Sequence, residues 1–326
     1  MDGVQSEPKT LIEAVIYFTD ADNCLNYLAA RRWPNGVICP TCGSKDVGFV
    51  ASRQIWQCRE CRSRKDKAQF SIKTGTILED SPLGLDKWLP AMWLIASNRN
   101  GISSWELHRA FDVTQKTAWF MLHRIRLAMQ DECHGGKLGG EVEVDETFIG
   151  GKARNMHTDR KVRMQQFGRN TGGKPVVIGA LQRGGKVRAK VSSDRKKPSM
   201  QSFVKDNVQK GSDIHSDEHA ETWKMDEYTH NVVNHLECYV NGNIHTNGVE
   251  NFWSLLKREI NGTYVSVEPY HLFRYVDEEA FRYNNRLPME DGERFSYLVR
   301  KIVGKGLTYA ELTGKVGQIQ EGTEAF

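Results

Sequence analysis

Hydrophobic and polar positions follow two different periods along the chain. Residues 19–32 and the stretch from residue 82 to residue 129 repeat apolar side chains every three or four positions, which indicates helices. From residue 141, alternating or continuous apolar runs bounded by glycine predict strands. A helical period returns near residue 247. Helices first, then strands and a further helix, predict a multidomain α+β protein.

The first helices have recognisable starts. Residues 19–32 are expected to begin at Thr19 or Asp20, both of which are side chains that cap helices. In LDKWLPAMWLIASNRNG, Pro90 is tolerated if Asp86 is the cap, since Pro90 then falls in the first turn.

Two more helices, joined by a short turn, are expected between residues 103 and 130. The first opens at Ser103, which forms with Glu106 the S-x-x-E pattern of a capping box. The second starts near Thr114, and its apolar face leaves Lys116 and Arg124 on other sides as candidate DNA contacts. Such a pair resembles a helix-turn-helix, whose second helix reads DNA. An ordinary helical linker domain is the alternative.

The first predicted strand carries many acids. In EVEVDETFIGG, residues 141–151, Glu141, Glu143 and Asp145 leave one face of the strand and the two valines leave the other. We expect only one face to be core, with Glu141 and Glu143 solvent-facing or structural. KPVVIGALQ and KVRAKVSS follow as a hairpin, then SDIHSDEH as a shorter strand and HTNGVENFWSLLKREING as a long helix.

Composition excludes some classes of protein. The 326 residues exceed one typical domain, and no apolar run approaches the ~20 residues that span a bilayer, so a membrane role is not expected. The start MDGVQSEPKT lacks the basic and apolar regions of a secretory signal. We therefore expect a cytoplasmic location, in which cysteines stay reduced.

Four of the seven cysteines have the spacing of a metal site. Cys39 and Cys42 form one C-x-x-C, and Cys58 and Cys61 form another after fifteen residues. This spacing is typical of a four-thiolate zinc ribbon. A segment of this size cannot support a conventional core, and a tetrahedral ion would organise it. The sequence therefore predicts structural Zn²⁺ on these four residues.

The net charge of +4 is small, but positive charge is clustered. Residues 152–174 hold seven basic side chains against one acid, and residues 183–197 hold seven against one. Solvated loops are the alternative reading of either cluster. Both clusters lie close to the acid-rich strand in the sequence, and this favours a polyanionic partner. Lys152 in the first cluster is a candidate DNA contact.

Two further acids follow at informative distances. Asp217 ends the strand-like GSDIHSD, and Glu250 lies in the first turn of a helix that starts near Asn247. Asp145 and Asp217 are separated by 71 residues, and Asp217 and Glu250 by 32.

This order of two aspartates and a glutamate resembles a DDE transposase with a ribonuclease-H-like core. More narrowly, VDETFIGGK, IHSDEH, HTNGVENFWSLLKREINGTY and FRYNNR resemble the zinc-ribbon insertion-sequence transposases, relatives of the Merlin DNA transposons. The resemblance covers nearly the whole chain, ribbon included. It implies divalent-metal-dependent hydrolysis at the ends of a DNA element, followed by strand transfer.

The resemblance also implies a catalytic site of Asp145, Asp217 and Glu250 that holds Mg²⁺ or Mn²⁺. Two charges ~4 Å apart repel by about 4 kcal/mol at an effective dielectric near 20, so three gathered carboxylates need a cation. Oxygen ligands favour magnesium or manganese over zinc. Asp145 would bridge two ions, and the other two acids would hold one each. Asp213 competes with Asp217, and Asn247 with Glu250, as replacement or supporting ligand.

Other residues are expected around this site. Glu146 is the expected supporting neighbour of Asp145, and Lys257 and Arg258 on the last helix are candidate phosphate contacts. Scattered histidines, none in an H-E-x-x-H motif, leave a zinc hydrolase as a weak alternative.

The predicted organisation has five parts. They are an N-terminal helical segment (1–33), a zinc ribbon (34–79), a helix-turn-helix-like domain (80–134), a ribonuclease-H-like mixed-sheet domain (135–290) and a C-terminal tail (291–326). The expected partners are double-stranded DNA, as element ends and as target within chromosomal DNA, and further copies of the chain in a homodimer or larger synaptic complex. A non-enzymatic regulator derived from a transposase, or a structure-selective nuclease of the same fold, are the alternatives.

Overall fold

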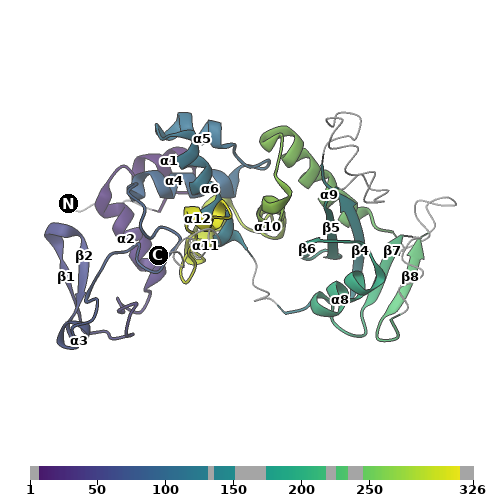
Figure 1. Ribbon diagram of the computed structural model, residues 1–326, viewed down its shortest axis with the longest axis horizontal. Helices are drawn as coiled ribbons and strands as arrows, with labels where there is room; N and C mark the ends of the chain where they lie inside the picture. The colour runs from purple at the N-terminus through teal and green to yellow at the C-terminus, as the bar shows by residue number, and fades with distance from the viewer. Residues whose placement is uncertain (1–6, 131–135, 151–173, 218–224, 234–244, 316–326) are drawn as a thin grey trace, which may run out of the picture. The chain divides into compact units, whose positions relative to one another are not determined.

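The computed structural model describes residues 7–130, 136–150, 174–217, 225–233 and 245–315, with the side chains of Asp217, Val232 and Val233 outside the description. These residues form two compact units, one within 1–129 and 288–326 and the other within 130–287 (Figure 1). None of the described helices has the length and hydropathy of a membrane span.

The first unit begins with helices and a small sheet. Helix α1 (Leu11–Tyr17) precedes α2 (Ala21–Arg32), which Asp20 caps as expected. Strands β1 (Val47–Val50), β2 (Ile55–Cys58) and β3 (Gln69–Phe70) form an antiparallel sheet in that order, with the short helix α3 (Arg59–Ser63) after β2. Trp33 and Trp56 pack edge to face with ring centroids 5.1 Å apart, so an aromatic contact joins this small sheet to the end of α2.

The larger part of the first unit is a helical core. It contains α4 (Leu85–Ser97), α5 (Ser104–Phe111), α6 (Gln115–Met129), α11 (Asp291–Arg300) and the short α12 (Tyr309–Leu312). The rings of Trp93 on α4 and Phe295 on α11 lie 5.0 Å apart. The segment after residue 290, whose role the sequence left open, thus packs into this core through α11.

One of the two expected helix starts in this core is confirmed and the other is not. The capping box of Ser103 and Glu106 is confirmed at the start of α5. The expected cap of α4 at Asp86 is wrong: Gly84 is the cap, so Pro90 lies in the second turn. The carbonyl of Asp86 therefore has no N–H from position 90 to accept.

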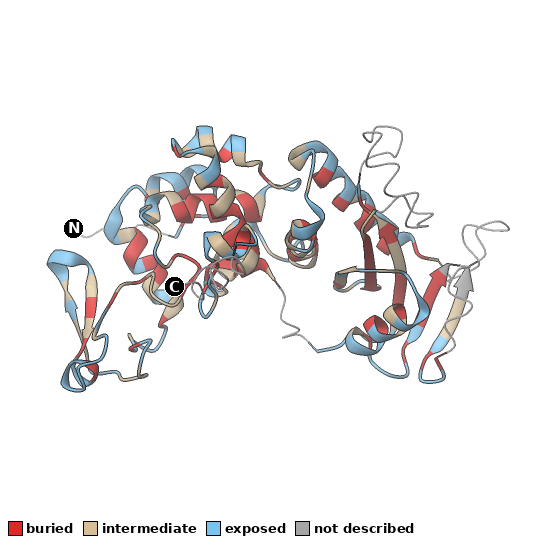
Figure 2. Cartoon of the chain, viewed as in Figure 1, coloured by how far each residue is buried: buried red, intermediate tan, exposed pale blue. Residues whose placement is uncertain are grey.

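Helix α6 is buried on more than its apolar side (Figure 2). The predicted apolar face is confirmed as buried, but His123, Arg124 and Arg126 are buried as well. Lys116, near the start of the helix, is exposed. The expectation that Arg124 lies away from the core is therefore wrong, because the helix is covered by the rest of its unit on that side too.

The second unit is built on one mixed sheet. It contains β4 (Glu141–Phe148), β5 (Val176–Gln182), β6 (Val187–Ser192), β7 (Asp213–Asp217) and β8 (Thr229–Val233) in the order β6-β5-β4-β7-β8. β4, β5 and β6 pair antiparallel, and the expected hairpin of β5 and β6 is confirmed. β7 pairs parallel with both β4 and β8.

Helices cover both faces of this sheet. On one face, Val142, Val144 and Ile178 pack with residues of α8 (Lys197–Asn207). On the other, Val177 and Leu181 pack with α9 (Asn247–Glu259) and α10 (Leu272–Asn284). A π-helical turn (Ile260–Tyr264) and a 3-10 turn (Pro269–His271) join α9 to α10. The expectation of a single core face is therefore wrong, and Glu141, Glu143 and Asp145 of β4 lie on the face that α9 covers.

Candidate active site and metal centre

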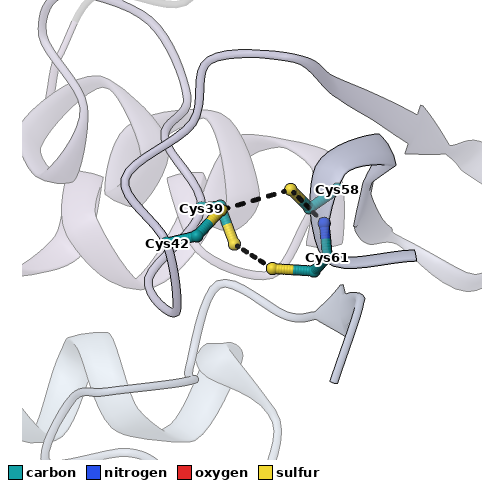
Figure 3. Close-up of side chains that lie close together, drawn as sticks. All are labelled: Cys39, Cys42, Cys58 and Cys61. Atoms are coloured by element: carbon teal, nitrogen blue, oxygen red, sulfur yellow. Dashed lines mark hydrogen bonds between the residues drawn. The ribbon is translucent and has the colours of Figure 1, made fainter. Parts of the chain in front are cut away.

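Four cysteine sulfurs gather beside the small sheet of the first unit (Figure 3). The sulfurs of Cys39 and Cys61 lie 3.7 Å apart, those of Cys42 and Cys58 lie 3.6 Å apart, and all four lie within 4.8 Å of one another. Sulfurs bound roughly 2.3 Å from one tetrahedral zinc ion are about 3.8 Å apart. The donor set and its spacing fit Zn²⁺.

Local structure shifts the pKa values of these thiols in opposite directions. Cys58 caps α3, and its sulfur accepts a hydrogen bond from the N–H of Cys61 at 3.5 Å. Burial raises the pKa of the Cys61 thiol to about 12. Burial would also raise the pKa of Cys39, but the N–H groups of Cys42 and Thr41 lower it to about 7. Within the described side chains, these cysteines are the one group of three or more metal-ligand residues this close together.

The second unit holds Asp145 against α9. Asp145 is half-buried on β4, and its Oδ2 accepts a hydrogen bond from the indole N–H of Trp253 at 2.9 Å. Gly179 lies opposite Asp145 on β5, and a Cβ there would lie 2.6 Å from the Trp253 ring. The missing side chain thus leaves the space through which the indole reaches Asp145.

Asp217 ends β7, the strand that pairs in parallel with β4. In the parallel pair of β4 and β7, Glu143 lies opposite His215. The pairing of these two strands ends there, and Asp145 and Asp217 each follow two residues later on their own strand. Since side chains alternate along a strand, Asp145 belongs to the face that α9 covers, as Glu143 does. Asp213 lies opposite Glu141, about 13 Å from Asp217 along β7, so the register favours Asp217 over Asp213.

Glu250 lies one helical turn before Trp253. It is exposed, and its Oε1 accepts a hydrogen bond from the Thr246 hydroxyl at 3.3 Å. The buried side of α9 contains Val249, Phe252, Trp253 and Leu256. Its exposed stripe includes Asn247, Glu250, Lys257 and Arg258. The candidate residues of this helix therefore share its open side, close to the indole that contacts Asp145.

Glu143 is a buried acid. Its side chain is 1% exposed, and its carboxylate lies 3.0 Å from the Arg183 Nε and 3.2 Å from the His245 Nδ1. The backbone N–H of Val249 donates to it at 3.0 Å. A solvent-facing Glu143 is thus wrong, and its structural role is the one that these contacts support. Glu141 is partly exposed and also pairs with Arg183.

Glu146 lies on the other face of the sheet. It follows Asp145 directly on a strand with regular pairing, so the two side chains leave opposite faces. Its Oε1 lies 3.8 Å from the Nη1 of Arg195. The structure therefore separates Glu146 from Asp145, because adjacent strand residues cannot share a face, and we leave it out of the proposed site.

The candidate DNA contacts fall into different surroundings. Lys116 is exposed, with its Nζ 4.5 Å from the centre of the Tyr309 ring. Arg124 donates to the carbonyl oxygens of Leu307 at 3.0 Å and Glu79 at 2.8 Å. This buried guanidinium is held by its own fold, so Arg124 does not enter the proposed DNA contacts. Lys152 and most of the cluster 152–174 lie outside the described residues.

The described histidines do not form a hydrolase centre. Burial lowers the pKa of both His215 and His230, which favours their neutral forms. The His230 ring lies 2.6 Å from the Ser216 hydroxyl. No group of metal ligands other than the cysteines occurs in the described side chains. His219 and His235 lie outside the described residues.

Three residues around Asp145 and Glu143 had no signal in the sequence. Trp253 looked like a packing residue of α9, Arg183 like one member of a basic cluster, and Gly179 like part of a continuous strand. Their roles depend on which strand lies beside which, and that is a property of the folded sheet.

Comparison with known proteins gives two matches to protein families. Residues 19–64 match the transposase zinc-ribbon domain, and residues 137–284 match the ISXO2-like transposase domain. A relative from Halobacterium salinarum, described as an uncharacterized protein in transposable element ISH50, is 28% identical over 257 residues, which cover 74% of this chain and 83% of the relative. No solved structure matches.

Proposed function

The chain belongs to the zinc-ribbon family of insertion-sequence transposases, and from this premise we propose that it binds the ends of an insertion sequence and catalyses DNA cleavage and strand transfer. The observation that carries the proposal is the register of β4 and β7. It supports the proposal because Asp145 and Asp217 each follow the last pair of this register, Glu143 and His215, by two residues, and Glu250 lies on the helix that packs against this sheet.

We propose a ribonuclease-H-like fold for the second unit. Its central strand β4 is paired on one side with an antiparallel hairpin and on the other with two parallel strands, with helices on both faces. This arrangement supports the proposal. It also brings the ends of β4 and β7 together, as a site built on adjacent strands requires.

Asp145, Asp217 and Glu250 would hold Mg²⁺ or Mn²⁺. Carboxylate oxygens are the donors that these ions prefer. Asp145 on β4 is half-buried and Glu250 on α9 is exposed, so a site between them would be open to a DNA strand. When bound, such ions activate a water or a 3′-hydroxyl and stabilise the leaving oxygen of a phosphoryl transfer.

The chain's own residues have separate tasks in this proposal. Trp253 orients the Asp145 carboxylate through its N–H. Lys257 and Arg258 lie on the same exposed side of α9 as Glu250, where they would contact the phosphates of the bound strand. Asn247 begins this stripe and remains the alternative third ligand. In the first unit, Lys116 near the start of α6 would contact the element end, as the start of a recognition helix does.

The partners follow from the reaction. Double-stranded DNA is both donor and target, so the protein would act on chromosomal DNA in the cytoplasm. Two element ends have to be brought together, which we propose occurs in a homodimer or a larger synaptic complex. The zinc ribbon would contribute end binding, since Arg59 and Arg64 are exposed on it.

The experiment is an assay of the full chain on DNA that carries the element ends, with Mg²⁺, followed by sequencing of cleaved products. We expect cleavage at the ends with the wild type and none with Asp145→Ala or in excess chelator. Cleavage that survives either treatment would exclude the proposed site.

The same assay separates the alternatives. A regulator would bind the ends and leave them intact with every divalent ion. A structure-selective nuclease would cut branched or mismatched DNA without the ends and would produce no joined strands. Either result would overturn the proposal.

A further inference from the structure

Glu143 is a charged group in a place that is costly for charge. Its side chain is 1% exposed, on the sheet face that α9 covers. A buried carboxylate persists where charges and hydrogen-bond donors compensate for its lost hydration. The contacts of Glu143 therefore show which groups stabilise its charge and which segment of the chain it fixes.

The partners of Glu143 come from two separate segments. Arg183, directly after β5, donates its Nε to Glu143 at 3.0 Å and its Nη2 to the carbonyl of His245 at 2.9 Å. His245 Nδ1 lies 3.2 Å from the carboxylate, and the N–H of Val249 donates to it at 3.0 Å. Glu143 and Arg183 together thus fix residues 245–249, where α9 begins.

The geometry at the start of α9 suits a carboxylate. The first N–H groups of a helix lack partners within the helix, and the positive end of the helix dipole favours a negative charge there. Glu143 provides that charge from the neighbouring strand.

Gly248 permits this close approach. A Cβ at residue 248 would lie 2.8 Å from the Glu143 Oε2 and 2.8 Å from the Leu181 Cδ2. A side chain at this position would therefore displace the Glu143 carboxylate and the end of Leu181, or the first turn of α9 itself.

We call the contacts of Glu143 and Arg183 with residues 245–249 the clamp. The clamp joins β4 and α9, the two elements that carry the proposed ligands Asp145 and Glu250. Glu143 precedes Asp145 by two residues on the same strand face, and Val249 is next to Glu250 on α9. We propose that Glu143 is a positioning residue, which with Arg183, His245 and Gly248 sets the distance between Asp145 and Glu250. The inference rests on the proposed function, because it assigns a task to Glu143 in the same metal site.

The test compares Glu143→Gln with Glu141→Gln in the full chain. Both changes remove one carboxylate that pairs with Arg183 from the same face of β4, but Glu141 is 42% exposed and pairs with Arg183 and His215 rather than with the start of α9. Three quantities are measured: hydrogen exchange of the peptide that contains residues 246–256, Mn²⁺ affinity by electron paramagnetic resonance, and the cleavage rate at element ends.

We expect Glu143→Gln to speed exchange at the start of α9 and to weaken Mn²⁺ affinity and cleavage by roughly 10–100-fold, the usual effect of losing a residue that orients a metal ligand. Glu141→Gln should stay within about 3-fold of the wild type, since surface charges contribute little. Faster exchange without a change in Mn²⁺ affinity would reduce Glu143 to a structural residue and overturn the inference, as would equal effects of the two variants.

A second pair of variants covers the case in which Glu143→Gln does not fold. Gly248→Ala keeps every charge and displaces the Glu143 carboxylate or the first turn, whereas Gly262→Ala places its Cβ in open space. The first should weaken Mn²⁺ affinity and the second should not, and equal affinities would contradict the clamp. Failure of the proposed function looks different: the wild type would then cleave no DNA, whereas the exchange of residues 246–256 would still respond to Glu143→Gln.

Discussion

Side chains of the same type take different roles according to their neighbours. On β4, Asp145 faces α9 and contacts Trp253, Glu143 is buried in the clamp, and Glu146 leaves the opposite face. Arginines differ in the same way. Arg124 and Arg183 are held by contacts within the fold, whereas Arg258 is exposed on α9. Residue type alone therefore does not identify a ligand or a DNA contact.

The contrast between Lys116 and Arg124 gives a prediction for DNA binding. Lys116→Ala should lower the slope of log affinity against log salt by about one, because one phosphate contact is lost. Arg124→Ala should leave this slope unchanged and should lower the free energy of unfolding by roughly 2–4 kcal/mol, since two carbonyl oxygens lose a buried charged donor. Titrations of an element end at several salt concentrations, with urea unfolding of both variants, measure these effects. A salt slope changed by Arg124→Ala and not by Lys116→Ala would contradict the assignment.

Some of these residue roles were predictable. The C-x-x-C spacing predicted the four zinc ligands because it is a local pattern, and the comparison with known families confirms the ribbon. The spacing of Asp145, Asp217 and Glu250 predicted a candidate site through its resemblance to a family. The burial of Glu143 and Arg124 was missed, because it depends on a helix and a strand far away in the sequence.

At the scale of elements, α9 connects the candidate site with a buried charge cluster. Its last residue, Glu259, lies in the interior together with Glu278, Glu279 and Arg282 of α10. The Nη2 of Arg282 lies 2.7 Å from Glu259 and 2.8 Å from Glu279. Three carboxylates therefore share one guanidinium, and this excess of negative charge is costly in the interior.

The cluster predicts a pH dependence of stability. Burial raises the pKa of Glu259 well above its ordinary value of 4.5, against the opposing effect of Arg282. A group with a raised pKa in the folded state stabilises the fold when protonated, so this contribution is present below pH 4.5 and is lost as pH rises through the folded pKa. The free energy of unfolding should fall by up to about 1.4 kcal/mol per pH unit in this window.

Urea unfolding at a series of pH values measures this effect. Glu259→Gln should flatten the dependence, and Glu250→Gln, an equal change at an exposed site of the same helix, should retain it. Parallel pH profiles for both variants would contradict the assignment to Glu259.

The element types were predicted better than their packing. The acidic strand, the hairpin and the helix near Asn247 are confirmed as β4, β5 with β6, and α9. Helix α8 and strand β8 were not predicted, since KPSMQSFVKDN begins with a lysine and a proline in a basic stretch and THNVV is short. The parallel pairing of β4 with β7 joins segments about seventy residues apart, so no local pattern could reveal it.

At the scale of the whole molecule, we expect the zinc ribbon to depend on a metal for its fold. Cys39→Ser should reduce bound zinc from about one ion per chain to none and unfold the ribbon, because zinc binding supplies roughly 10–16 kcal/mol in such sites. Cys24→Ser is the matched control: Cys24 is buried in the same unit, and its thiol donates to the Phe18 carbonyl at 3.1 Å. Metal analysis with limited proteolysis measures both. Zinc content unchanged by Cys39→Ser would contradict the ribbon.

The central claim is that neighbouring strands of one sheet bring Asp145 and Asp217 together for strand transfer. Its most direct test is to sequence the junctions between element ends and target DNA formed in Mg²⁺ by the wild type, Asp217→Asn and Asp213→Asn. Both variants lose one carboxylate from β7, but Asp213 lies opposite Glu141, four residues before Asp145, whereas Asp217 follows the end of this pairing. We predict junctions with the wild type and Asp213→Asn, and a loss of roughly 100-fold or more with Asp217→Asn, as expected when a metal ligand is removed. Junctions that persist with Asp217→Asn, or disappear only with Asp213→Asn, would contradict the account.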